Sequence, residues 1–91
     1  MFYTYVLKSI DFVKYYTGYT HDLENRLNEH NEGKSTYTSK YKPWRVVYYE
    51  VFEDPENAIA REKQIKGGSR QKKIDLINKL NEGWQDLYEK I

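Results

Sequence analysis

The chain of 91 residues contains no cysteine. Disulfides and thiolate metal sites are therefore excluded, which fits a reducing cytosol. No apolar run approaches the roughly 20 residues that cross a bilayer, and no charged segment followed by an apolar one opens the chain. The length allows one layered core but no separate targeting domain. We therefore expect a single cytoplasmic domain over residues 1–91 with no membrane association.

The chain also has little net charge, because 15 basic residues nearly balance 14 acidic ones to give +1 at pH 7. Bulk electrostatics therefore does not by itself indicate a nucleic-acid partner. The charges are unevenly distributed, with six basic residues and one acidic residue between Arg61 and Lys73 and an acidic tail beyond Glu82. Such a basic run is either a solvated helix face or a surface for a polyanion.

Two short segments, residues 2–9 and 14–20, are rich in aromatic and β-branched residues and flank a turn-like stretch. This pattern predicts an antiparallel hairpin. If its loop is even-numbered and centred between residues 10 and 11, Tyr5 lies opposite Tyr16 and both rings rise from one sheet face. An odd loop would separate them.

Leu23, Leu27 and His30 recur at helical spacing and predict a helix over residues 22–32 that Thr20 or Asp22 can cap and Gly33 ends. Arg26 lies four residues before His30, so both share one flank of this helix. The polar segment 33–43 is typical of an exposed loop, and residues 44–53 return to strand character.

Asp54 followed by a proline predicts the start of a further helix. On this helix Ala58, Glu62 and Ile65 share one face, so a carboxylate lies among inward-pointing residues and needs a partner. Two glycines end the helix, and Ser69 can cap the next one. That next helix is expected to pack through Ile74, Ile77 and Leu80, and residues 83–91 are expected to form a last amphipathic turn or short helix.

The expected order is strand, strand, helix, strand, helix, helix, short helix. This order predicts a three-stranded, mainly antiparallel sheet flanked by helices, an α/β (α+β) sandwich. We find no internal repeat.

Five elements occur in order along the chain: Tyr3-Thr4-Tyr5, Tyr16-Thr17-Gly18, the helix 22–30 with Arg26 and His30, the pair Tyr37-Thr38, and the segment 60–66 around Glu62. Together they resemble the GIY-YIG nuclease superfamily and, within it, the small stand-alone bacterial branch. The resemblance covers about residues 2–80 and implies a GIY-YIG-like fold, with residues 83–91 as a helical tail. The first triad lacks the glycine and isoleucine that name the motif.

Phosphodiester hydrolysis needs an activated water and neutralisation of the charge that builds on the phosphate. The resemblance implies that Tyr5 relays the proton of the attacking water and that Tyr16 orients the water or the phosphate. Arg26 would clamp the phosphate, and His30 would transfer a proton or hold the substrate. Glu62 would hold a single Mg²⁺ or Mn²⁺ that binds weakly without substrate.

Each of these residues also has a structural interpretation. Tyr5 and Tyr16 are then packing residues of the hairpin. Arg26 then forms an ion pair with Glu24 or Glu29, His30 is a satisfied boundary residue, and Glu62 pairs with Arg26 or a lysine. We expect instead that the side-chain ends of these residues meet around a space for one phosphate.

The sequence thus predicts a divalent-metal-dependent endonuclease that hydrolyses DNA in repair or processing, with little sequence specificity. RNA as substrate, a protein partner for targeting and the oligomeric state stay open. The predicted nucleic-acid-binding residues are Lys34, Tyr37, Lys40, Lys42, Lys63, Lys66, Arg70 and Lys72. Two alternatives are a catalytically silent nucleic-acid-binding module on the same fold and a protein-interaction adaptor that uses Trp44, Tyr48 and Trp84.

Overall fold

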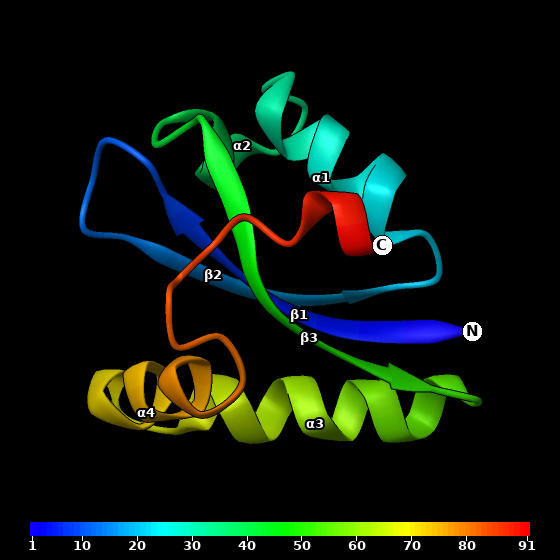
Figure 1. Cartoon of the computed structure of the whole chain (residues 1–91). Helices are drawn as coiled ribbons and strands as arrows, with labels where there is room; N and C mark the ends of the chain where they lie inside the picture. The colour runs from blue at the N-terminus through cyan, green and yellow to red at the C-terminus, as the bar shows by residue number, and fades with distance from the viewer.

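The computed structural model describes all 91 residues as one antiparallel sheet between two helical layers (Figure 1). The strands are β1 (Phe2–Ser9), β2 (Tyr15–Thr20) and β3 (Trp44–Phe52), in the order β2-β1-β3. The helices are α1 (Leu23–Asn31), α2 (Thr36–Ser39), α3 (Pro55–Gly67), α4 (Arg70–Leu80) and a final 3₁₀ turn, η1 (Tyr88–Lys90). The predicted sandwich is confirmed, and its sheet is wholly antiparallel.

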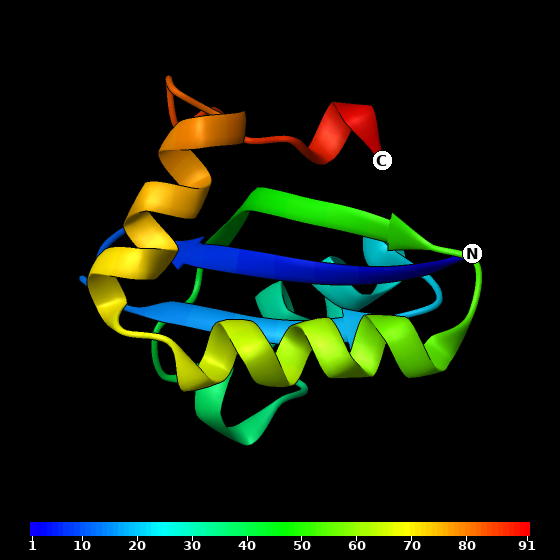
Figure 2. The same ribbon diagram turned by 90° about the horizontal axis from the view of Figure 1, so that it is seen from below.

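The two layers differ in what they contain. Helices α1 and α2 and the C-terminal turn lie on one side of the sheet, and α3 and α4 lie on the other (Figure 1). Figure 2 shows α3 running along the strands, while α4 turns and crosses their ends toward β3. No helix is long and apolar enough to cross a membrane.

The predicted hairpin register is wrong by two residues. Tyr5 pairs with Gly18, and Tyr16 pairs with Leu7. The connection is wider than expected because the Ser9 amide donates to the Lys14 carbonyl at 3.0 Å. Since side chains alternate with a period of two, a shift of two residues leaves every side chain on its face. Tyr5 and Tyr16 therefore still share one face, as expected.

The predicted helix starts are confirmed by their caps. Asp22, Asp54 and Ser69 each accept a hydrogen bond from the amide three residues further on. Gly33, just after α1, has the left-handed φ of +83° that only glycine adopts without strain. These local signals fix where α1, α3 and α4 lie along the chain.

Three expectations need correction. The segment 33–43 is not an exposed loop throughout, because it contains α2, whose Thr38 is fully buried. Leu80 does not pack helix α4 down, since it is 63% exposed and Ile77 alone is fully buried there. Trp44 and Tyr48 are each only 2% exposed, so the aromatic surface required by the adaptor hypothesis does not exist.

The core has two parts, one on each face of the sheet. The part facing α1 contains Tyr5, Leu7, Leu23, Leu27, Trp44 and Val46, with Leu87 and Ile91 of the tail packed against it. The part facing α3 and α4 contains Val6, Val47, Tyr48, Ile65 and Ile77. The C-terminal tail is held in place because the Leu87 amide donates to the Val46 carbonyl at 2.9 Å. Buried polar residues occur on both faces, with His30 and Thr38 on the first and Thr4 and Asn81 on the second.

Candidate active site

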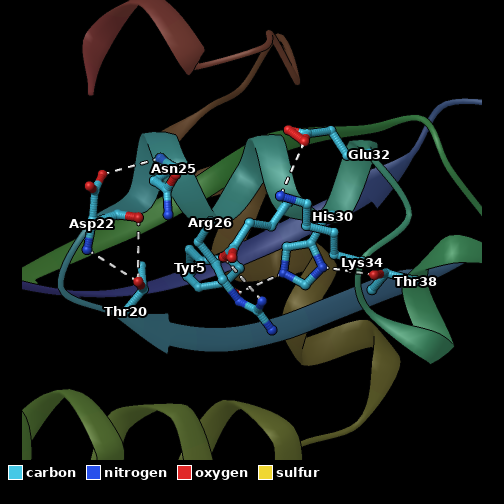
Figure 3. A network of polar contacts seen from close by, with 10 residues as sticks. Tyr5, Thr20, Asp22, Asn25, Arg26, His30, Glu32, Lys34 and Thr38 are labelled. Atoms are coloured by element: carbon cyan, nitrogen blue, oxygen red, sulfur yellow. Dashed lines mark hydrogen bonds and ion pairs between the residues drawn. The ribbon is translucent and has the colours of Figure 1, made fainter.

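A buried chain of polar side chains joins β1, α1 and α2. The hydroxyl of Tyr5 lies 3.0 Å from His30 Nε2, and His30 Nδ1 lies 2.8 Å from Thr38 Oγ1 (Figure 3). Tyr5 is 1% exposed, and the other two residues are fully buried. Both ring nitrogens of His30 therefore have a partner, as a neutral imidazole with one donor and one acceptor requires.

The protonation states in this chain follow from burial. Desolvation, reinforced by the nearby positive charge of Arg26, lowers the pKa of His30 to about 4. His30 is therefore neutral at pH 7. Desolvation, followed by the proximity of Tyr16, raises the pKa of Tyr5 above its ordinary value, while Arg26 acts in the opposite direction. Tyr5 is consequently a neutral phenol that Arg26 biases toward ionisation.

Tyr16 lies against this chain from the edge strand β2. Its ring centroid is 4.8 Å from that of His30 and 6.3 Å from that of Tyr5. Gly18 makes this approach possible, because a Cβ at that position would come within 2.6 Å of the Tyr5 hydroxyl oxygen and 3.0 Å of the Tyr16 ring. Gly18 is thus needed for the close packing of the Tyr5 and Tyr16 side chains.

Arg26 extends from α1 beside Tyr5 (Figure 3). Its guanidinium lies 3.4 Å from the Glu29 carboxylate, and both side chains are about one-third exposed. Although burial disfavours its charged form, Tyr5 and Glu29 raise the pKa of Arg26. Of the two ion pairs given as the structural alternative for Arg26, the one with Glu29 is present. The exposed part of the guanidinium still keeps donors available for an anion.

Glu62 reaches the cluster from the opposite layer. It stands on α3, which packs along the edge strand β2. Its carboxylate is 16% exposed and lies 2.8 Å from the ammonium of Lys66. Lys66 in turn lies 5.7 Å from the centre of the Tyr16 ring, and the charge of Glu62 contributes to the raised pKa of Tyr5. The ion pair with a lysine is confirmed, and all five residues meet beside β2.

The expected open space between these residues is not present. The two cavities of the protein lie elsewhere, one between α3 and α4 with about 290 Å³ and one beside Trp84 with about 230 Å³. Lys66 occupies the space over Tyr16, and the Tyr37 ring lies 6.4 Å from the Tyr16 ring. The expectation failed because Lys66 neutralises Glu62 and covers an aromatic face at the same time. Both Lys66 and Tyr37 are exposed, so side chains rather than backbone close the cluster.

The residues predicted to bind nucleic acid are all exposed: Lys34, Tyr37, Lys40, Lys42, Lys63, Lys66, Arg70 and Lys72. The structure brings Lys66 and Tyr37 to the group of Tyr5, Tyr16, Arg26, His30 and Glu62, the candidate catalytic cluster. Lys34 forms an ion pair with Glu32 at 3.5 Å, and Lys72 lines the cavity between α3 and α4. Two of the eight residues thus lie at the cluster, and Lys72 lies away from it beside the cavity between α3 and α4.

Sequence reasoning gave no role to Thr38, which fixes the orientation of the His30 ring. The one signal for it was its place in the Tyr37-Thr38 pair. No group of three or more histidine, cysteine or acidic side chains is arranged to hold a metal ion. Any metal at Glu62 would therefore depend on water and phosphate oxygens for its remaining ligands.

Comparison with known proteins agrees with this arrangement. The family model of the GIY-YIG catalytic domain matches residues 1–75. A UPF0213 protein of Staphylococcus saprophyticus is 43% identical over 77 residues, which cover 84% of this chain and 93% of that protein. A UPF0213 protein of Clostridium perfringens is 42% identical over 79 residues, covering 86% of this chain and 84% of that protein.

A solved structure has the same fold. The solution NMR structure of a UPF0213 protein from Bacillus halodurans superposes with a TM-score of 0.61 at 34% identity and covers 94% of this chain and 93% of that one. The names of these relatives state no activity. The motif residues, their convergence and these matches show that the chain belongs to the GIY-YIG nuclease family.

Proposed function

We propose that the protein is a divalent-metal-dependent endonuclease that hydrolyses phosphodiester bonds of DNA in repair or processing. The observation that carries this proposal is the hydrogen bond between the buried Tyr5 hydroxyl and His30, beside Arg26 and Glu62. Burying these polar groups lowers stability unless each has a partner. Their presence together in the core of a 91-residue chain supports a chemical role.

Tyr5 relays the proton of the attacking water. As its oxygen accepts that proton, its own hydroxyl proton passes across the 3.0 Å hydrogen bond to His30 Nε2. Nδ1–H of the imidazole then donates to Thr38 Oγ1, which fixes the tautomer that this direction of transfer requires. Because the pKa of His30 is only about 4, the imidazolium is short-lived and returns its proton.

Arg26 stabilises the charge that builds on the phosphate. Its guanidinium is permanently charged, partly exposed and only weakly held by Glu29 at 3.4 Å. On substrate binding, the Arg26 guanidinium would leave the Glu29 carboxylate and bind a phosphate oxygen. A solvent-screened ion pair would then be replaced by a charge-assisted hydrogen bond in a site that excludes water. Tyr16, packed on His30, orients the phosphate from the other side.

The donor set at Glu62 fits a single hard cation. A carboxylate oxygen is the ligand that Mg²⁺ and Mn²⁺ prefer, and this carboxylate already faces one cation, the Lys66 ammonium at 2.8 Å. When bound, the metal would neutralise phosphate oxygens and lower the pKa of a bound water. Lys66 would then be released from Glu62 and free to contact the phosphate backbone.

The test is cleavage of plasmid, duplex, flap and branched DNA with Mg²⁺ or Mn²⁺. We expect nicking by the wild type and loss of activity by at least about a hundredfold in Glu62→Gln, which keeps size and packing but loses the charge. Glu56→Gln is the matched control, because Glu56 is an exposed carboxylate on the same helix. Equal activity in wild type and Glu62→Gln would contradict the proposal.

One observation favours a second function, the silent nucleic-acid-binding module on the same fold. Tyr5 is 1% exposed and Lys66 occupies Glu62, so a water has no open path to the phenol in this conformation. The module predicts salt-dependent DNA binding that survives Glu62→Gln without any product. Parallel binding and cleavage assays on the same preparations separate the two functions.

Little sequence specificity is expected from either function. Basic side chains that contact backbone phosphates carry affinity without sequence information. Selection over a pool of random duplexes should therefore enrich no strong motif, and enrichment of one would contradict this part of the proposal.

A further inference from the structure

A second group of cations lies away from the catalytic cluster. It borders the cavity of about 230 Å³, which is lined by Lys8, Ser9, Ile10, Arg45, Val47 and Trp84. Val47, Tyr15 and Trp84 belong to the part of the core that faces α3 and α4, so this cavity opens on the side of the sheet away from Tyr5. We call it the Lys8–Arg45 pocket.

The charges of this pocket lack a counterion. Lys8 and Arg45 are directly opposite each other on β1 and β3, a like-charge arrangement that destabilises a sheet. Arg70 adds a third charge, because it and Lys8 both lie over the Tyr15 ring, at 5.5 and 5.8 Å from its centre. All four ion pairs of the protein are formed by other residues.

One donor of the pocket has no partner. Arg45 Nε is buried, yet it makes no hydrogen bond, which lowers stability compared with a satisfied donor. Lys8 donates only to the carbonyls of Ser9 and Phe12. Desolvation and the charges of Arg45 and Arg70 lower the pKa of Lys8. Both the repulsion and the unused donor would be relieved by one anion.

We propose that the Lys8–Arg45 pocket binds a phosphate group and, resting on the nuclease function proposed above, takes a backbone phosphate of the substrate away from the cleaved bond. Guanidinium and ammonium donors converging on a small cavity match the several oxygens of a phosphate. The surface between the two places is also basic. Lys66 lies over the Tyr16 ring and Arg70 over the ring of the next residue back, Tyr15.

This edge of the sheet therefore gives one strand of nucleic acid a continuous route. The nucleic-acid strand would leave the catalytic cluster at Tyr16, follow the outer edge of β2 past Tyr15 and reach Lys8 and Arg45. Consecutive strand residues point to opposite faces of the sheet, so the route passes around the edge rather than over one face. Only an edge strand such as β2 allows such a path.

The test compares Arg45→Met and Lys8→Met with Lys79→Met, a control that removes an exposed lysine from α4 outside the pocket. DNA affinity is measured by fluorescence anisotropy across a salt series, using a labelled oligonucleotide in the presence of Ca²⁺ or without metal. Each pocket variant should lower affinity about tenfold at low salt. Each should also reduce the salt slope by about one, while Lys79→Met should bind like the wild type.

The pocket variants should remain folded, so a loss of affinity would not be due to unfolding. Methionine keeps the aliphatic stem, and removing one of two opposed charges should leave Tm unchanged or higher. Arg45→Gln provides a second, polar replacement, and its affinity for DNA should fall as far as that of Arg45→Met. If all three pocket variants bind DNA with the wild-type affinity and slope, the pocket proposal is overturned while Glu62-dependent cleavage stands unaffected.

Failure of the nuclease proposal is recognised separately. If the wild type neither binds nor cleaves DNA, the pocket is titrated with inorganic phosphate and a mononucleotide while the indole N–H signal of Trp84 is followed by NMR. A saturable shift that is lost in Arg45→Met supports a phosphate site for a free ligand. Absence of any shift overturns the pocket as well.

Discussion

The two faces of the sheet serve different purposes. The face toward α3 and α4 buries Val6, Val47, Ile65 and Ile77 in a mainly apolar core. The opposite face buries a tyrosine hydroxyl, an imidazole and a threonine hydroxyl, which are satisfied by one another. Apolar burial stabilises a fold in proportion to area, whereas a satisfied polar network contributes little net stability. Both faces thus stabilise the fold through apolar burial, and the face toward α1 also holds a hydrogen-bonded chain of polar side chains in position.

The apolar face has a polar network of its own, but a different one. Tyr48 donates to the Glu50 carboxylate, which also accepts from Arg61 Nε at 2.8 Å. Both charged side chains are more than one-quarter exposed. This network joins α3 to β3 next to Glu62 rather than filling the core. It therefore helps to set the position of the helix that carries Glu62 to the candidate catalytic cluster.

The largest effect is expected from removing the buried hydroxyl on the reactive face. Tyr5→Phe keeps the ring but removes the proton relay, so cleavage should fall about 10²- to 10⁴-fold. The free energy of unfolding should fall by only about 1–3 kcal/mol, because His30 Nε2 loses its partner. Tyr3→Phe, on the same strand and face, is the control and should cleave normally. Near-normal cleavage by Tyr5→Phe would contradict a catalytic role for the face toward α1.

The apolar face should give the reverse pattern. Ile77→Ala removes a fully buried side chain and should lower the free energy of unfolding by about 2–5 kcal/mol. kcat per folded molecule should not change. Urea denaturation and single-turnover cleavage measure the two quantities. Leu80→Ala on the same helix, being exposed, should change stability by less than about 0.5 kcal/mol. A large effect at residue 80 would contradict the packing of α4.

The smallest effect is expected in how the free energy of unfolding depends on pH, and it tests His30 on the face toward α1. The pKa of His30 is about 4 in the folded protein and near 6.5 when unfolded. Between these values the unfolded state binds a proton that the folded state does not, so stability falls as pH falls from 6.5 to 4. The loss should reach at most about 3 kcal/mol. His30→Gln should remove this part of the pH dependence in denaturation curves, and His21→Gln should retain it.

Much of the fold was predictable because its signals are local. The caps at Asp22, Asp54 and Ser69 and the left-handed Gly33 each depend on atoms a few residues apart. Helix α2 was missed because four residues show no helical period. The hairpin register was missed because it depends on how Ser9 organises the loop.

The candidate site was predictable as a set of residues but not as an arrangement. The resemblance indicated Tyr5, Tyr16, Arg26, His30 and Glu62, and the structure brings them together. It gave no sign that Thr38 would hold His30 or that Lys66 would close the cluster. Those contacts depend on side chains from different layers, whose competition for one space is decided by packing.

The sequence by itself determined the order of the strands and of the longer helices, and where those helices start. Periodicity and capping act over a turn or a pair of strands, so they can be recognised without a structure. Only the tertiary structure decided that Tyr5 meets an imidazole 25 residues away, that Lys66 pairs with Glu62 over Tyr16, and that Lys8 and Arg45 share a pocket without a counterion. Such meetings between distant residues depend on how whole layers pack, and no local pattern encodes that geometry.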